Sequence, residues 1–142
     1  MLRKTLLIFA TLSLLASCNS KTEEQSGENA LSSTEIHLND GEKWQVNAEM
    51  KPHLNGGKEL LENYKANGGS DYIELAKQLI THNRELIQSR TMKGEAHDEL
   101  HKWLYPHMKM IARLKKAGDA EAAAPIITEL RDSYRSYDRF FE

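Results

Sequence analysis

The chain has 142 residues, with 19 lysines and arginines, 21 aspartates and glutamates, six histidines and a single cysteine. This length suits one domain, and a net charge of −2 without a block of basic residues argues against a nucleic-acid partner. One cysteine can form neither a disulfide within the chain nor a zinc site built from several thiolates.

Residues 1–17 have the organisation of a secretory signal peptide. Arg3 and Lys4 precede an apolar run, and small residues precede Cys18, the only cysteine. Leu15-Ala16-Ser17-Cys18 resembles the lipobox of bacterial lipoproteins, whose cysteine is lipidated and becomes the first residue of the mature protein. The resemblance implies a lipid anchor on Cys18 in the bacterial cell envelope, and we expect the outer membrane, at its periplasmic or its surface face. An ordinary secretory signal with a chance cysteine is the alternative.

Residues 18–34 are polar and almost free of large apolar side chains. Such a segment cannot bury enough surface to offset the entropy of ordering, so we predict a flexible tether. No apolar run after the signal peptide is long enough to cross a membrane. Attachment to the membrane would therefore come from the lipid on Cys18.

The remaining segment, 35–142, is predicted to be one domain that begins with a short β-hairpin. Apolar and polar residues alternate from Ile36 to Val46, on both sides of the turn signal Asn39-Asp40-Gly41. A lone hairpin is marginal in water, so we expect it to pack against the residues that follow.

From Asn47 onward the apolar spacing becomes helical. Four helices are predicted. The first spans 47–66, the second runs from 70 or 71 to the turn near Met92, the third spans 95–117 and the fourth 119–141. We expect Asn47 to cap the first helix, and Asp71 and Glu74 have capping-box spacing in the second. Gly56-Gly57 costs the first helix on the order of 1 kcal/mol per glycine, which predicts a weak point or a break there.

Short loops and regular seams indicate how these helices pack. The seam of the last helix alternates steps of four and three, and its members are Ala123, Ile127, Leu130, Tyr134, Tyr137 and Phe141. This spacing favours near-parallel packing of neighbouring helices. We therefore predict an all-α fold, an up-and-down four-helix bundle preceded by the short β-hairpin.

The segment from Met92 to Met110 is rich in histidine and methionine. His97 and His101 are one helical turn apart, close enough to bind one ion. Met108 falls on the same side of the helix, about 10 Å further along its axis. Imidazole suits zinc and copper, and thioether sulfur favours Cu(I).

An antiparallel arrangement of the second and third helices would bring His82 within one turn of His101. We therefore predict a copper or zinc site with His97 and His101 as its principal ligands. The further candidate ligands are His82, Met92, His107 and Met108. Ordinary helix surface and core packing would account for the same residues without a metal.

Two other binding functions stay open. The four-helix arrangement has an architectural likeness to four-helix bundle cytochromes, which implies a non-covalent haem bound by His and Met. Its axial ligands here would be Met50 or Met92 with His97 or His107. Alternatively, the chain is an interaction module that recognises an envelope protein through the hairpin and the aromatic end of the last helix. The aromatic residues of that end are Tyr134, Tyr137, Phe140 and Phe141.

The motifs favour a binding protein over an enzyme. The chain has no Gly-x-Ser-x-Gly, no phosphate-binding loop and no calcium loop. In the segment from His97 to His101, Asp98 stands where the His-Glu-x-x-His pattern of zinc hydrolases requires a glutamate. As a whole, the chain resembles the small helical lipoproteins common in bacteria, and this resemblance implies a location without a chemistry.

Overall fold

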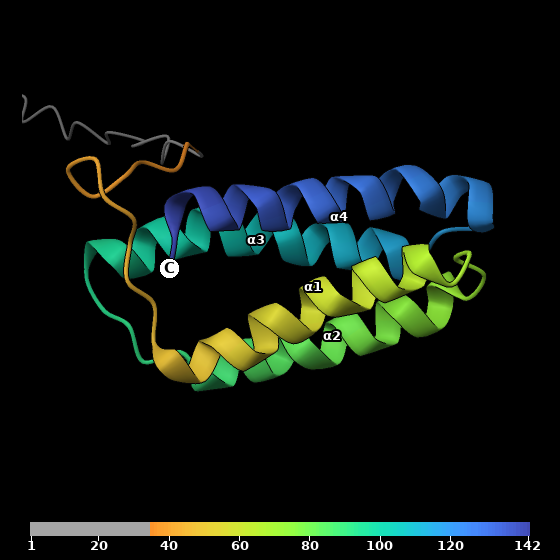
Figure 1. Cartoon of the computed structure of the whole chain (residues 1–142), viewed down its shortest axis with the longest axis horizontal. Helices are drawn as coiled ribbons and strands as arrows, with labels where there is room; N and C mark the ends of the chain where they lie inside the picture. The colour runs from red at the N-terminus through yellow and green to blue at the C-terminus, as the bar shows by residue number, and fades with distance from the viewer. Residues whose placement is uncertain (1–34) are drawn as a thin grey trace, which may run out of the picture. The chain divides into compact units, whose positions relative to one another are not determined.

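The structure is a computed structural model that describes residues 35–142. Figure 1 shows α1 and α2 as one antiparallel pair of helices, with α3 and α4 as a second antiparallel pair beside it. The predicted all-α class is confirmed. The helices are α1 (Lys51–Ala66), α2 (Tyr72–Ser89), α3 (Glu95–Lys115) and α4 (Ala120–Phe140), and a 3-10 turn, η1 (Ala48–Met50), precedes the first.

The predicted signal peptide, the tether and the lipidated Cys18 lie outside the described residues. Within 35–142, none of the helices is both long enough and apolar enough to span a lipid bilayer.

The predicted β-hairpin is wrong beyond its turn. Asn39 and Glu42 exchange two backbone hydrogen bonds of 2.9 Å, and Asp40 and Gly41 between them have φ values of 51° and 93°. The pairing does not continue, because the backbone groups of His37 are engaged elsewhere. The segment from residue 35 to residue 46 therefore has a tight turn without strands.

Glu99 on α3 holds the first part of this segment. Its carboxylate accepts the backbone N–H of His37 at 2.8 Å and the ammonium of Lys102 at 2.6 Å. Burial by itself raises the pKa of Glu99, but the hydrogen bonds from Lys102 and His37 outweigh it, so the pKa lies below its ordinary value. The carbonyl of His37 accepts from the indole N–H of Trp44 at 2.6 Å.

The residues from Trp44 to Val46 pair in parallel with the C-terminal residues instead. Trp44 donates its N–H to the carbonyl of Phe140 at 2.8 Å and accepts from Glu142 at 3.0 Å; Val46 donates to Glu142 at 2.9 Å. The side chains of Trp44 and Val46 are buried in the core, whereas Leu38 is 41% exposed. Burial of a large apolar side chain contributes on the order of 2 kcal/mol, which favours this pairing over the hairpin.

The predicted helix caps have different outcomes. Asp71 accepts the N–H of Glu74 at 2.8 Å, which confirms the cap at the start of α2. The side chain of Asn47 does not cap a helix. It donates to the hydroxyl of Thr91 at 2.8 Å and accepts the N–H of Thr91 at 3.1 Å, and so joins the start of the bundle to the connection between α2 and α3.

α1 runs unbroken through Gly56 and Gly57, contrary to the prediction of a weak point. A Cβ at Gly56 would overlap the imidazole of His82, and a Cβ at Gly57 would overlap the phenol of Tyr134. The two glycines therefore lie where side chains of α2 and α4 pack directly on the backbone of α1. This packing offsets the low helix propensity of glycine.

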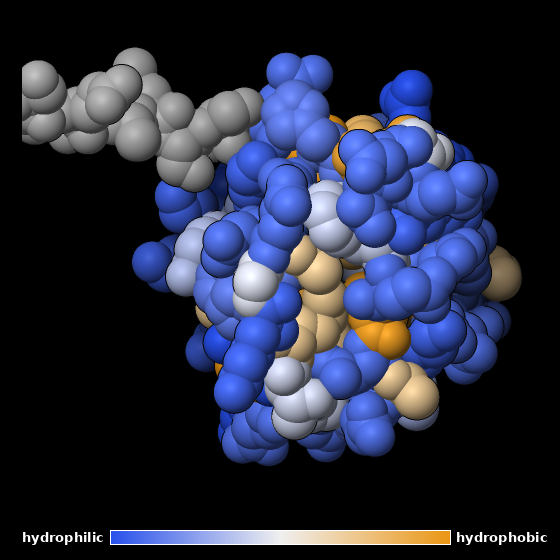
Figure 2. All heavy atoms as spheres, turned by 90° about the vertical axis from the view of Figure 1, so that its left-hand side faces the viewer, coloured by the Kyte–Doolittle hydropathy of each residue, from blue (hydrophilic) through white to orange (hydrophobic). Residues whose placement is uncertain are grey.

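The core contains the predicted seam of α4. All six seam residues are buried, and Phe140 next to them is partly buried against the core. Three of the four aromatic residues considered as an interaction face, Tyr134, Tyr137 and Phe141, are thus core residues. Figure 2 looks onto the end of the domain where the 35–47 segment lies, and there hydrophilic side chains surround a central area of apolar atoms.

We predict that Gly57→Ala lowers the free energy of unfolding by about 1–3 kcal/mol, the usual cost of overpacking, although alanine has the higher helix propensity. Urea unfolding followed by circular dichroism measures the change. Gly118→Ala is the matched control, because a Cβ at Gly118 meets no atom within 4 Å. The control should stay within about 0.5 kcal/mol of the wild type. A stabilised Gly57→Ala variant would contradict the close approach of Tyr134.

Candidate metal centre

The structure brings two of the predicted metal ligands together on α3. The ring centroids of His97 and His101 lie 4.4 Å apart. However, the guanidinium of Arg90 donates a hydrogen bond to Nε2 of His101. Burial, helped by the charges of Arg90 and His97, lowers the pKa of His101. A metal ion bound at this nitrogen would have to displace the positively charged Arg90.

The two predicted thioether ligands differ in exposure. Met92 packs partly buried against the core, and Met108 is 37% exposed. Among the residues from 35 to 142, no third histidine, cysteine, aspartate or glutamate joins His97 and His101 in a group of ligand atoms.

His107 is a core residue with no solvent exposure. Its ring stacks on Trp103 with centroids 4.7 Å apart, meets the edge of Tyr134 at 4.6 Å, and places Nδ1 2.9 Å from the hydroxyl of Ser133. Burial lowers the pKa of His107 to about 4, so the ring is neutral at pH 7. A haem bound through His107 would have to displace these aromatic side chains, so this packing does not fit that ligand.

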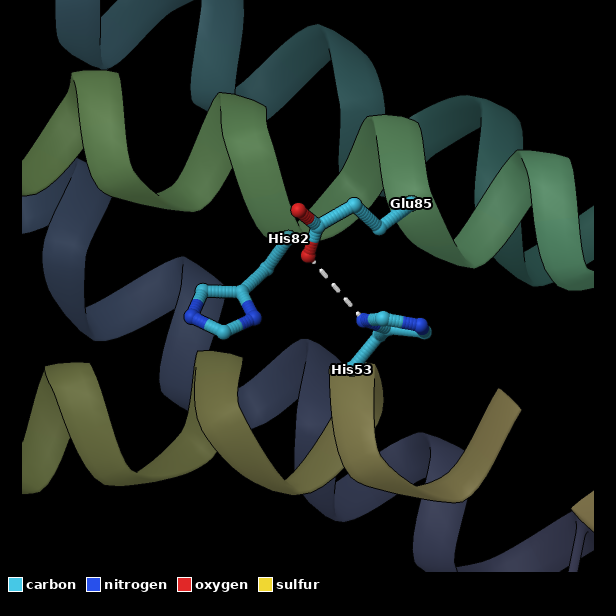
Figure 3. Close-up of side chains that lie close together, drawn as sticks. All are labelled: His53, His82 and Glu85. Carbon is cyan, nitrogen blue, oxygen red and sulfur yellow. Dashed lines mark ion pairs between the residues drawn. The ribbon is translucent and has the colours of Figure 1, made fainter. Parts of the chain in front are cut away.

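His82 lies with His53 and Glu85, between α1 and α2, rather than beside His101. Figure 3 shows the carboxylate of Glu85 pointing into the space between the two imidazoles. One ligand atom of each residue lies within 4.8 Å of those of the other two. Nδ1 of His53 is 3.1 Å from Oε2 of Glu85, and Nδ1 of His82 is buried without a hydrogen-bond partner. These three residues could hold a metal ion.

Helix geometry and one glycine position these three side chains. His82 and Glu85 are three residues apart on α2 and therefore share a face. His53 is in the first turn of α1, which runs antiparallel to α2. Because Gly56 has no side chain, the imidazole of His82 can lie directly against α1. The site is thus built on two regular helices rather than on a loop.

The spacing of residues across the turn at Gly68 and Gly69 is the sequence signal for this group. Counting equal distances from Gly69 pairs position 53 with 85 and position 56 with 82. The same counting across the turn near Met92 paired His82 with α3. His53, which we expected to be a surface residue, is not among the predicted ligands.

Solvent reaches the outer side of this group. The side chain of His53 is 27% exposed and that of Glu85 is 44% exposed, while Nδ1 of His82 is buried. Two imidazole nitrogens and a carboxylate oxygen are a donor set that zinc uses in proteins. The fold and this group together define a helical-bundle protein with a candidate metal centre.

No protein family, curated protein or solved structure matches this chain. The function proposed below therefore rests on the residues of the chain itself.

We predict that His107 makes the domain sensitive to acid. Its pKa falls from 6.5 in the unfolded chain to about 4 in the fold, so the unfolded chain binds the proton more tightly. The stability that depends on neutral His107 is fully present above pH 6.5 and is lost as the pH falls towards 4. The loss amounts to about 3 kcal/mol.

Urea unfolding between pH 7 and pH 4 measures this dependence. His107→Gln removes the titrating ring and keeps a polar group opposite Ser133, so the variant should lose stability less steeply with acid. The same pH slope in the variant and in the wild type would rule out His107 as its source.

Proposed function

We propose that this chain is a lipid-anchored protein of the bacterial cell envelope that binds a divalent metal ion through His53, His82 and Glu85. The observation that carries the metal part of the proposal is the convergence of three donor atoms within 4.8 Å of one another. Nδ1 of His82 is buried without a hydrogen-bond partner and so is free to bind an ion, although Nδ1 of His97 and Nε2 of His107 share this property.

Zinc is the ion to test first. It is bound in proteins by imidazole nitrogen and carboxylate oxygen, and it needs no redox partner. Copper(II) follows as the competitor, since it binds a given nitrogen and oxygen site more tightly than zinc. Oε2 of Glu85 lies 3.1 Å from Nδ1 of His53, so an incoming cation competes with that contact.

The arrangement favours this group over the pair on α3. His97 and His101 offer two imidazoles between the anion Asp98 and the cation Arg90, which hydrogen-bonds to His101, whereas His53 and His82 offer two imidazoles beside the anion Glu85. A metal cation is stabilised by the carboxylate and destabilised by the guanidinium. The proposed ligands therefore replace His97 and His101, and His82 is retained from the predicted set.

The lipid anchor is supported by the sequence of residues 1–18 alone. A basic start, an apolar run and Leu15-Ala16-Ser17-Cys18 agree in order and spacing with a lipoprotein signal. In this proposal, the lipid on Cys18 holds the metal centre at the membrane.

We predict that the chain carrying Cys18→Ser, purified without an affinity tag, binds one Zn²⁺ per molecule in calorimetric titration. His82→Ala and Glu85→Gln should each weaken binding at least about tenfold, because each removes a ligand. Circular dichroism checks that the variants keep their helices.

The double variant His97→Ala/His101→Ala is the matched control, because it also removes imidazoles from the chain. It should bind zinc like the parent protein. Loss of binding in this control together with normal binding by His82→Ala would return the site to α3.

We predict that Cys18 carries the anchor when the full-length chain is expressed in a bacterium. The wild type should enter the detergent phase in Triton X-114 partition and gain the mass of attached acyl chains, whereas Cys18→Ser should gain no acyl mass. A mature wild-type protein with an unmodified Cys18, found by mass spectrometry, would exclude lipidation.

A further inference from the structure

The candidate metal centre has fewer ligands than zinc requires. His53, His82 and Glu85 supply three donors, and no fourth histidine, cysteine, aspartate or glutamate of the described residues joins them. Zinc is four-coordinate in closed structural sites, and a site with three protein ligands keeps one position for water or another molecule. An ion held by these three side chains would therefore keep one exchangeable position.

The exposure of the ligands indicates where that position lies. On the inner side, Nδ1 of His82 is buried and the His82 ring packs against Gly56. On the outer side, Glu85 is 44% exposed and His53 is 27% exposed. The fourth position of a bound ion therefore faces solvent, where a donor group of another molecule can reach it.

Glu85 also has a partner for the time when it leaves an ion. Its carboxylate lies 3.1 Å from Nδ1 of His53. The carboxylate and this imidazole can thus return to each other as they leave the ion. Release does not leave Glu85 without a partner, which lowers the cost of giving up the ion.

We propose that the centre is an exchange site, which passes its ion directly to an imidazole or thiolate group of another metal-binding protein. This inference rests on the metal-binding function proposed above. The incoming donor forms a bond to the ion at the open position, and the water there leaves to solvent. His53, His82 and Glu85 then release the ion one after another.

A cobalt-substituted protein tests the open position directly. Co²⁺ is loaded into the Cys18→Ser chain, and imidazole or glutathione is added while the visible spectrum is recorded. We expect the spectrum to change while cobalt stays with the protein in gel filtration. A charge-transfer band with glutathione alone would identify thiolate as the donor that binds. An unchanged spectrum with both donors would show that the coordination is closed and would overturn the proposal.

The kinetics of zinc transfer test the exchange step. The zinc-loaded chain is mixed with increasing concentrations of the chelator 4-(2-pyridylazo)resorcinol, whose colour reports the transferred ion. A tenfold higher chelator concentration should raise the transfer rate about tenfold, because the chelator binds the ion before the protein releases it. A rate that is independent of chelator concentration would mean unaided dissociation and would contradict the inference.

Two controls separate this inference from the proposed function. His97→Ala/His101→Ala should transfer zinc at the wild-type rate, because these residues lie outside the site. A chain that binds neither Zn²⁺ nor Co²⁺ at the outset would refute the proposed function itself. Tight binding with slow, chelator-independent release would retain the metal centre and refute only its role in exchange.

Discussion

The position of α1 depends on two adjacent residues without side chains. Gly56 faces the imidazole of His82 on α2, and Gly57 faces the phenol of Tyr134 on α4. Each glycine costs the isolated helix on the order of 1 kcal/mol, and the packing of two rings on its backbone compensates for that cost. The candidate metal centre follows from the same contact, because His82 lies close to His53 only when its ring can rest against α1.

The sequence predicted those parts of the fold that local interactions decide. Periodicity and capping placed the helices within a few residues, and Asp71 caps α2 as its spacing indicated. The hairpin prediction was wrong because local contacts decide only its turn. The residues on either side of the turn bind Glu99 and the C-terminal residues instead, and both of these partners are distant in sequence. The grouping of His82 with His53 and Glu85 was not predicted because α2 has two neighbours, and only the packing decides which of them His82 faces.

The environment of each imidazole decides whether a histidine can serve as a metal ligand. The same imidazole ring has three different surroundings in His107, His101 and His82. His107 is enclosed by aromatic side chains, and His101 accepts a hydrogen bond from Arg90. His82 has a carboxylate, a second imidazole and solvent within reach. The third environment places a carboxylate between two imidazoles and leaves solvent access for an ion.

The parallel pairing of residues 44–46 with the C-terminal residues has a consequence for the order of folding. Gln45 and Glu142, whose side chains hydrogen-bond across this pairing, are 97 positions apart. The α1–α2, α2–α3 and α3–α4 contacts join helices that follow one another in the chain, so their loops are short and cheap to close. The pairing needs the longest closure and so should form after the helices have packed. During synthesis, Trp44 and Val46 therefore stay without their backbone partners until the end of α4 has left the ribosome.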